Sequence, residues 1–495
     1  MSEKRSQSDA HLAARNHWAS KKPKVDDEKK IPQPKAGSSN DPIEIGDDSE
    51  EEAHWEAGSI EVSCRLLQDR SHELHGGTAS AEANKEALAL LDLIGMPDLS
   101  KTYQFNFAVD LDVFLTHLHR DAVRRRAKIV FVTGSDVVQN SDDAEFVKKA
   151  FDIEEVKANL PFRFGSHHSK MMQKKDTSSS TILGDRFLQD MTEYLRSYNK
   201  VTISQLIDDI KLYDYLSIDI EILLSSPGIY NLSQGPQQGY GKFLQLLKRN
   251  DLLLGDSDAN HNVLAQVSSI ASSFKVQKGQ HASVFTHLIC PLMFSKTNRF
   301  SSLGPSENSA RNHQTQYNYT PNIVYPTLDE VADSNLGYMS GVAIHFNNNN
   351  ARLNANYLQN IKPYLCKWNS SSKNSKTGRE NVMPHTKIYA CDNADNWSSL
   401  RWALVGSHNL SKQAWGEPLA NNEYRICSYE LSIFVHQKEN RKLIPVYASD
   451  SLQNDTHNIP IRLPFTLPPR RYLAQDRPWS ASTASSRRDR FGNTN

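Results

Sequence analysis

Two short stretches in the second half of the chain decide the fold: His385-Thr386-Lys387 and Gly406-Ser407-His408-Asn409-Leu410-Ser411. The first precedes an apolar run, so it is predicted to begin a strand, on which residues two apart point to the same face. His385 and Lys387 should therefore share one pocket. The second stretch follows a predicted strand at residues 401–405, and its glycine and serine permit a tight turn. This turn should present Asn409 and a hydroxyl beside the histidine.

These residue types suit the transfer of a phosphoryl group. A neutral imidazole attacks phosphorus or moves a proton, lysine is a compact cation for a phosphoryl oxygen, and asparagine donates without a charge. Taken singly, each motif is more often ordinary structure. Both in order, followed by Lys412-Gln413-Ala414-Trp415-Gly416, indicate a phosphoryl-transfer half-site that works without a metal. We therefore expect neither a metal ligand set nor a cofactor.

An enzyme of this type needs a second half-site. One histidine must bond to phosphorus, while the other protonates the leaving group and later activates water. The first half of the chain holds His168 and Lys170 within Phe164-Gly165-Ser166-His167-His168-Ser169-Lys170-Met171-Met172. Alone, this segment would be interpreted as the polar edge of a strand. With the second motif present, it is the predicted counterpart.

Composition limits the class of protein. The chain of 495 residues has room for two domains. It contains no apolar stretch long enough to cross a bilayer and begins without a signal peptide, so we expect an intracellular protein without membrane attachment. Its five cysteines are scattered and never paired as CxxC, which favours reduced, buried thiols. The formal net charge is zero, so any nucleic-acid contact must come from local patches.

The order of predicted strands and helices indicates a layered α/β protein. Residues 1–57 are polar and charge-blocked, and we predict a disordered N-terminal tail there. Residues 58–205 and 206–479 are predicted to form two halves, and residues 480–495 a flexible tail. The predicted strands are 103–109, 128–132, 218–224, 286–289, 341–346, 387–389, 401–405 and 430–435, and the predicted helices 85–94, 111–118, 186–197 and 201–212.

The N-terminal tail carries two short patterns. Lys21-Lys22-Pro23-Lys24-Val25 resembles a nuclear-localisation signal, with a solvated charge run as the alternative. Ile43 and Ile45 precede the acidic residues 47–52 and resemble a SUMO-interacting segment. The corresponding expectations are a nuclear protein and a contact between the tail and SUMO or a repair factor.

The motifs together resemble the tyrosyl-DNA phosphodiesterases, a branch of the phospholipase D superfamily that clears peptide or other adducts from DNA 3′ ends. The resemblance spans most of the ordered chain and rests on residues 165–172, Pro227-Gly228, Ser268-Ser269, 383–387, 406–416, Ser428-Tyr429-Glu430-Leu431 and Asp476-Arg477-Pro478-Trp479. It implies two similar phospholipase D-like halves, each a mixed β-sheet flanked by helices, facing each other across one active-site cleft. It also implies a monomer that acts on single- and double-stranded DNA 3′ ends carrying such adducts, including those left by topoisomerase I.

The resemblance also implies residue roles. His168 would be the nucleophile that forms a phosphohistidine, and His385 the general acid and then the base. Lys170, Lys387 and Asn409 would hold phosphoryl oxygens, and Glu430 would orient the nucleophilic histidine. The residues implied to contact DNA or substrate are Phe164, Ser268, Ser269, Ser407, Ser411 and Trp479. For Phe164, core packing is an equal alternative.

The first half departs from the family pattern. In the family, the first HxK strand continues through an apolar hairpin to its own asparagine, and then to a glutamine that orients the acid histidine. Here Met172 is followed directly by Gln173-Lys174-Lys175-Asp176 and a serine run, so several tens of residues are missing. Asn199 follows a predicted helix and is not a replacement. An alternative transcript, a misplaced splice boundary or a natural pseudoenzyme would each produce this sequence.

Two other functions stay open at this stage. The shortened chain would bind DNA ends but turn over little if the missing hairpin is essential. A phospholipase or cardiolipin hydrolase of the wider superfamily is the third interpretation. The lack of an apolar membrane-binding segment argues against a lipid substrate, as do the matches at Ser268-Ser269 and at Asp476-Arg477-Pro478-Trp479.

Overall fold

The chain divides into two units, residues 1–58 and 59–495, and every residue described below belongs to the second. The structure is a computed structural model. It describes residues 94–107, 109, 111–134, 151–162, 165–167, 182–255, 259–271, 274–275, 281–294, 309–348, 350–369, 377–448, 450 and 457–495. The predicted N-terminal tail, the helix at 85–93 and the first HxK motif from His168 onward lie outside these residues.

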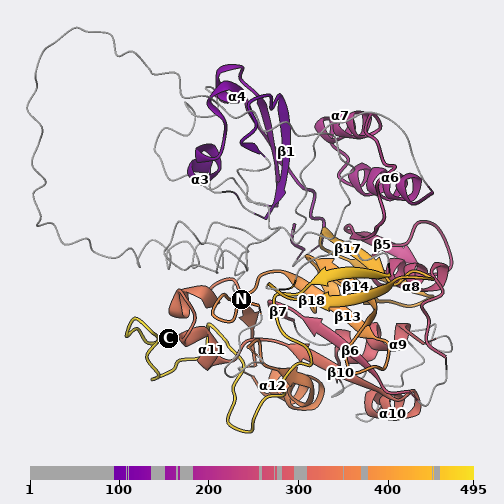
Figure 1. The fold of residues 1–495 in the computed structure, drawn as a ribbon, viewed down its shortest axis with the longest axis vertical. Coiled ribbons are helices and arrows are strands. Elements are labelled where there is room, and N and C mark those ends of the chain that lie inside the picture. The colour runs from indigo at the N-terminus through magenta and orange to yellow at the C-terminus, as the bar shows by residue number, and fades with distance from the viewer. Residues whose placement is uncertain are drawn as a thin grey trace, which may run out of the picture. The chain divides into compact units, whose positions relative to one another are not determined.

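The second half is built on a nine-stranded mixed sheet. Its main path runs β12-β10-β6-β13-β14-β17-β4, with β18 and β19 joined at the side of β14. Strand β13 lies between β6 and β14, and all three are neighbours in Figure 1. The nine strands are β4 (Glu221–Ser225), β6 (His261–Gln266), β10 (Tyr319–Val324), β12 (Leu365–Cys366), β13 (Lys387–Asp392), β14 (Leu400–Gly406), β17 (Glu430–His436), β18 (Lys442–Val446) and β19 (Asn458–Arg462).

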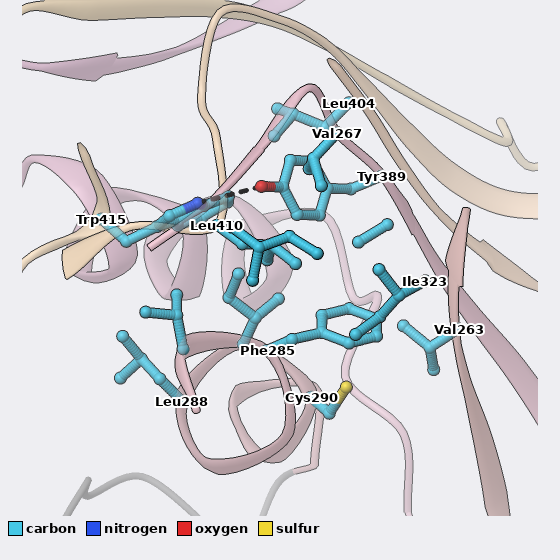
Figure 2. Packing of buried hydrophobic residues seen from close by; sticks show 14 of the residues in the cluster. Val263, Val267, Phe285, Leu288, Cys290, Ile323, Tyr389, Leu404, Leu410 and Trp415 are labelled. Atoms are coloured by element: carbon cyan, nitrogen blue, oxygen red, sulfur yellow. Dashed lines mark hydrogen bonds between the residues drawn. The ribbon is translucent and has the colours of Figure 1, made fainter. Parts of the chain in front are cut away.

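Apolar side chains bury this sheet on both faces. Tyr389 and Cys391 of β13 belong to one core cluster, while Ile388 and Ala390 belong to another. This split follows from the alternation of side chains along a strand, and it explains why the strand sequences are apolar throughout. On the first face, Phe285, Leu288 and Cys290 of a helical segment pack against the sheet (Figure 2).

The first half contributes a smaller, three-stranded parallel sheet in the order β1-β2-β3. These strands are β1 (Lys101–Asn106), β2 (Lys128–Thr133) and β3 (Ile153–Lys157), and the helices α6 (Ile182–Arg196) and α7 (Val201–Ile210) follow them. A shared core joins residues of β1, β2, β3, α6 and α7 to Ile222 and Leu224 of β4 and to Tyr429. The core of the first half therefore extends to the edge of the large sheet.

The remaining elements are helices and short strands. They are α3 (Leu111–Thr116), α4 (Arg120–Arg124), β5 (Gly228–Asn231), α8 (Gly239–Arg249), β7 (Ser269–Ile270), β8 (Phe274–Lys275), β9 (His281–Ala282), η2 (Phe285–Ile289), α9 (Cys290–Leu292), α10 (Ser309–Gln316), α11 (Leu328–Ala332), η4 (Gly337–Gly341), β11 (His345–Phe346), α12 (Ala351–Asn356), η5 (Tyr357–Ile361), η6 (Lys362–Tyr364), α13 (Lys412–Trp415), β15 (Glu417–Pro418) and β16 (Glu423–Ile426).

The predicted α/β class, with mixed sheets flanked by helices, is confirmed. Two predicted strands are wrong. Residues 286–289 lie in the π-helix η2, and of residues 341–346 only His345–Phe346 is a strand, after the 3₁₀-helix η4. The cause is shared: a short apolar run suits a buried helix as well as a buried strand, and periodicity alone does not separate them.

The C-terminal segment beyond Trp479 differs from the predicted flexible tail. Arg487 forms ion pairs with Asp329 of α11 at 2.9 Å and with Asp333, which directly follows α11, at 2.8 Å. The Asp489 carboxylate accepts a hydrogen bond of 3.1 Å from the backbone N–H of Tyr338. These bonds attach the segment to α11 and η4, because Arg487 pairs with two carboxylates that lie far from it in the sequence.

Other predictions concern single features of the chain. Cys290, Cys366, Cys391 and Cys427 are free and buried, as predicted for these four thiols, and Cys64 lies outside the described residues. Within the described ranges, no helix has the length and apolar character needed to span a membrane.

Candidate active site

The second motif lies at one end of the large sheet, where β13 and β17 begin and β14 and β6 end. Lys387 pairs with Gly406, and Gly406 pairs with Ser432, so β13, β14 and β17 are in register at this point. On the other side, Gln266 at the end of β6 pairs with Ile388. The chain leaving β14 therefore turns directly beside the start of β13, as the sequence predicted.

His385 and Lys387 differ in their surroundings. His385 is exposed and precedes β13, whereas Lys387 is the first residue of the strand and is 3% exposed. The Lys387 Nζ donates a hydrogen bond to the main-chain carbonyl of His385. The lysine thus holds the backbone of the histidine and brings its positive charge to the same place.

The side chain of Asn409 is held through its carbonyl oxygen. Its Oδ1 accepts hydrogen bonds from the backbone N–H of Ser269 at 2.9 Å and of Ser268 at 3.2 Å. An amide has one acceptor end and one donor end. Because backbone N–H groups can only donate, these contacts fix which end is which and direct the Nδ2 donor away from β7. Asn409, Ser268 and Ser269 are therefore one hydrogen-bonded group.

Ser407 connects the same turn to Glu430. The Ser407 hydroxyl donates to Glu430 Oε2 at 2.5 Å and accepts from the backbone N–H of Leu431 at 2.9 Å. Glu430 is 1% exposed and begins β17. A buried carboxylate needs such donors, because burial without hydrogen bonds is costly. Ser407 thus lies against the proposed orienting carboxylate.

The turn depends on one glycine. A Cβ on Gly406 would lie 2.4 Å from the Leu431 carbonyl oxygen and 2.4 Å from the Ser432 Cα. Any side chain there would push β14 away from β17, so glycine permits the close approach. Ser411 ends the turn, and its hydroxyl accepts from the backbone N–H of Ala414 at 3.1 Å as the N-cap of α13.

The described part of the first motif rests on the segment before Glu430. The backbone N–H of Tyr429 donates to the Ser166 carbonyl at 2.8 Å, and His167 forms a parallel bridge with Tyr429. A Cβ on Gly165 would lie 2.2 Å from the Cys427 carbonyl oxygen, so only glycine fits. The bridge pairs the residues directly before His168 and Glu430 in sequence.

Three predicted site residues, Phe164, His168 and Lys170, lie outside the described residues. Trp479 is described and lies in the core, 1% exposed. Its indole N–H donates to the Gly341 carbonyl at 2.9 Å, and its ring stacks on Tyr338. The structure therefore brings together Ser268, Ser269, Lys387, Ser407, Asn409, Ser411 and Glu430, with His385 joined through Lys387. Trp479 belongs instead to the large hydrophobic core.

The chemistry of the assembled groups suits an anion. A lysine ammonium, an asparagine amide, hydroxyls and an imidazole are donors or cations that stabilise phosphoryl oxygens. Among the described residues, no group of three or more His, Cys, Asp or Glu side chains could hold a metal ion. No role was predicted for His408, which lies inside the turn, because its residue type alone carries no signal of one.

Comparison with known proteins identifies the family. The sequence model described as tyrosyl-DNA phosphodiesterase matches residues 70–175 and 173–473. The chain belongs to the tyrosyl-DNA phosphodiesterase family. The two matched segments meet at residues 173–175, which is where the sequence predicts a missing hairpin.

Curated relatives bear the same family name. A probable tyrosyl-DNA phosphodiesterase of Schizosaccharomyces pombe is 28% identical over 349 residues, covering 64% of this chain and 59% of that protein. Tyrosyl-DNA phosphodiesterase 1 of Saccharomyces cerevisiae is 24% identical over 454 residues, covering 79% of this chain and 80% of that protein. The chain thus spans less than two thirds of the first of these relatives and four fifths of the second.

Solved structures agree on the fold. The yeast tyrosyl-DNA phosphodiesterase superposes with a TM-score of 0.62 at 22% identity, covering 81% of this chain and 97% of that one. This likeness confirms the phospholipase D-like fold predicted from the motifs.

Proposed function

We propose that this protein hydrolyses the bond between a DNA 3′ phosphate and a tyrosyl or other adduct. The observation that carries the proposal is the convergence of Lys387, Asn409 and Glu430 at one end of the sheet, in a chain of this family. A cation and a fixed amide donor beside His385 are the groups that a phosphoryl transfer requires. A lipid substrate has no comparable support.

The proposed reaction has two displacements at phosphorus. In the first, an imidazole nitrogen of His168 forms a bond to phosphorus while the bond to the tyrosyl oxygen breaks, and His385 gives its proton to that oxygen. In the second, His385 takes a proton from water, the water oxygen bonds to phosphorus, and the phosphorus–nitrogen bond breaks. The products are the free tyrosyl compound and DNA with a 3′ phosphate, and both histidines return to their starting states.

The described contacts support roles for the other groups. Lys387 and Asn409 would stabilise the charge on the phosphoryl oxygens in both steps. Glu430 would orient His168, and the bridge between His167 and Tyr429, the residues just before these two in sequence, supports that pairing. Ser268 and Ser269 bind Asn409 through their backbone N–H groups, so a DNA phosphate near their hydroxyls would lie next to the reacting phosphate.

The proposal is tested with the purified full chain and an oligonucleotide bearing a 3′-phosphotyrosine, in the presence of a chelator. We expect a DNA 3′-phosphate product. We further expect that stopping the reaction with denaturant at alkaline pH yields a covalent protein–DNA species that His168→Ala abolishes. The proposal is overturned if cleavage persists when both His168 and His385 are changed to alanine.

An extended variant of this protein tests the effect of the missing hairpin. Inserting an apolar hairpin with an asparagine turn after Met172 should raise the rate, since each preorganised donor is worth about 10²–10³ in such a site. If only the extended chain cleaves, the present form is a DNA-end-binding protein, and its affinity for the same oligonucleotide should then survive. If neither form cleaves or binds, the proposed function is wrong.

We also propose a nuclear location, supported by the basic cluster at residues 21–25. A fluorescent fusion of the full chain should lose its nuclear signal when Lys21, Lys22 and Lys24 are changed to alanine. The apolar pair Ile43 and Ile45 supports binding of SUMO by the tail, and changing both to alanine should abolish capture of the chain on immobilised SUMO.

A further inference from the structure

His408 lies inside the GSHN turn and is fully buried. It directly precedes Asn409, and both of its ring nitrogens have hydrogen-bond partners. Its Nδ1 lies 2.7 Å from the Ser432 hydroxyl on β17, and its Nε2 lies 3.0 Å from the Ser225 hydroxyl on β4. The side chain thus bridges two neighbouring strands from the turn that carries Asn409.

The contacts determine the tautomer of His408. The Ser225 hydroxyl donates its single hydrogen to the Ala414 carbonyl at 2.6 Å. It can therefore only accept from His408, so Nε2 carries the hydrogen. In the neutral ring Nδ1 is then an acceptor, which the Ser432 hydroxyl satisfies. In this series of hydrogen bonds, Ser432 donates to the imidazole, the imidazole donates to Ser225, and Ser225 donates to the Ala414 carbonyl on α13.

The main chain of His408 is held as well. The Tyr389 hydroxyl donates to the His408 carbonyl at 2.9 Å, and the Trp415 indole N–H donates to that hydroxyl at 3.3 Å, a bond drawn in Figure 2. Asn409 therefore follows a residue whose ring is bonded to β4 and β17 and whose carbonyl is bonded to β13. On its other side, the Leu410 N–H donates to the Ser269 carbonyl at 3.2 Å.

We propose that His408 is a positioning residue of the active site: its imidazole, held between Ser225 and Ser432, fixes the turn that aims the Asn409 amide at the phosphoryl group. This inference rests on the proposed function. The ring is buried and bonded at both nitrogens, so His408 acts through Asn409 and not on the substrate. A misplacement of about 1 Å at such a donor can cost roughly 10²-fold in rate.

The alternative is a histidine that serves only the stability of the core. The two roles differ in what a substitution changes. A stabilising residue lowers the fraction of folded protein, whereas a positioning residue lowers kcat in molecules that remain folded and leaves KM nearly constant. The two roles also differ in a double-mutant cycle, because only a positioning residue loses its effect once Asn409 is absent.

The first test compares His408→Leu, which removes both ring hydrogen bonds, with His408→Gln, whose amide can replace the Nε2–H donor to Ser225. We expect kcat on the 3′-phosphotyrosyl oligonucleotide to fall about 10- to 100-fold in His408→Leu, with KM within about threefold and partial recovery in His408→Gln. In an Asn409→Ala background, His408→Leu should change kcat less than about twofold. His313→Leu is the matched control, since His313, on α10, is also buried and is hydrogen-bonded to the Tyr319 hydroxyl.

The second test does not need turnover. In protein labelled with ¹⁵N at asparagine, the side-chain amide signal of Asn409 is the one that disappears in Asn409→Ala. His408→Leu should shift or broaden this signal, and His313→Leu should leave it unchanged. If His408→Leu does not fold, Ser432→Ala, which removes only the donor to Nδ1, is judged by the same criteria.

The outcomes separate the two proposals. The role of His408 is overturned if His408→Leu keeps the wild-type kcat. It is also overturned if the loss of kcat in His408→Leu adds fully to the loss in Asn409→Ala and the amide signal of Asn409 does not move. A wild-type chain that does not cleave contradicts the proposed activity of this form, while the amide signal still decides whether His408 positions Asn409.

Discussion

The two motif regions are held in different ways. The second motif lies between strands β13, β14 and β17 of one sheet, and each of these has hydrogen-bonded neighbours on both sides. The described part of the first motif, residues 165–167, has no strand partner within the described residues of its own half. It is held by the segment Cys427-Ser428-Tyr429, which belongs to the other half. The second half-site is thus supported within its own sheet, whereas the backbone of residues 166–167 depends on a segment of the other half.

The aromatic cluster behind His167 explains this dependence. The Tyr429 ring stacks on Tyr198 with centroids 4.2 Å apart and also contacts His167. His167 donates from Nδ1 to the Asn106 carbonyl at 2.9 Å, and its Nε2 lies 2.9 Å from the Tyr198 hydroxyl. One tyrosine of the second half therefore completes the core of the first.

Removing that tyrosine should give the largest effect. Tyr429→Ala deletes a buried ring, and we expect the free energy of unfolding to fall by about 3–5 kcal/mol. Urea unfolding measures this loss. Hydrogen exchange should also become faster in peptides covering residues 165–167. Tyr364→Ala, at a buried tyrosine of the large core, is the matched control and should leave those peptides protected. If both variants behave alike, the first motif does not depend on Tyr429.

Asn409→Ala tests the second half-site. We expect kcat to fall about 10²–10³-fold, because a preorganised donor to the phosphoryl group is lost. The unfolding free energy should also fall, by about 1–3 kcal/mol, because the backbone N–H groups of Ser268 and Ser269 lose their acceptor. Single-turnover cleavage of the 3′-phosphotyrosyl oligonucleotide measures the step directly. Asn322→Ala removes another buried asparagine of the same sheet, on β10, and should lower stability without lowering kcat. The reverse pattern would contradict the site.

A smaller effect is the loss of stability at acid pH that we expect from His287. Burial lowers the pKa of His287 in η2 to about 4, and its Nδ1 already accepts from the backbone N–H of Ser283. The unfolded chain binds a proton near pH 6.5, whereas the folded chain does so only near pH 4. The free energy of unfolding therefore keeps its full value above about pH 6.5. It falls by on the order of 2–3 kcal/mol as the pH drops toward 4.

Unfolding measured between pH 7 and pH 4 should show this slope, and His287→Gln should reduce it. The remaining slope comes in part from His313, because burial lowers its pKa to about 4 as well. Because His287 belongs to the large core, hydrogen exchange at low pH should accelerate in β6 and η2 more than in β1 and β2. An equal acceleration in both sheets would show that the acid sensitivity does not arise at His287.

The smallest effect concerns Trp479. Trp479→Phe keeps an aromatic ring but removes the hydrogen bond to the Gly341 carbonyl, and we expect a loss of about 1 kcal/mol in unfolding free energy. If Trp479 acts only in packing, KM for the oligonucleotide stays constant. A raised KM with unchanged stability would instead support the DNA contact predicted from the sequence.

Much of the second half was predictable because its strands are long and its motifs are local. The predicted strands 387–389, 401–405 and 430–435 correspond to Lys387–Asp392, Leu400–Gly406 and Glu430–His436. The turn after β14 was also predicted, because glycine and serine there have a direct conformational meaning.

Contacts between distant segments were not predictable. The bond between Asn409 and the backbone of Ser268 and Ser269 joins residues about 140 positions apart, and no local pattern encodes it. The same holds for His408, whose partners Ser225 and Ser432 lie on different strands. The π-helix η2 escaped prediction because its five residues are all buried, so they show no helical face.

The contact between Ser166 and Ser428 joins residues 262 positions apart. Synthesis proceeds from the N-terminus at roughly 5–20 residues per second, so residues 165–167 leave the ribosome roughly 10–50 seconds before their partners. During that time their aromatic core lacks Tyr429. A nascent chain that stops before residue 427 should therefore expose this core to chaperones, and the first half-site is completed only after most of the chain has been made.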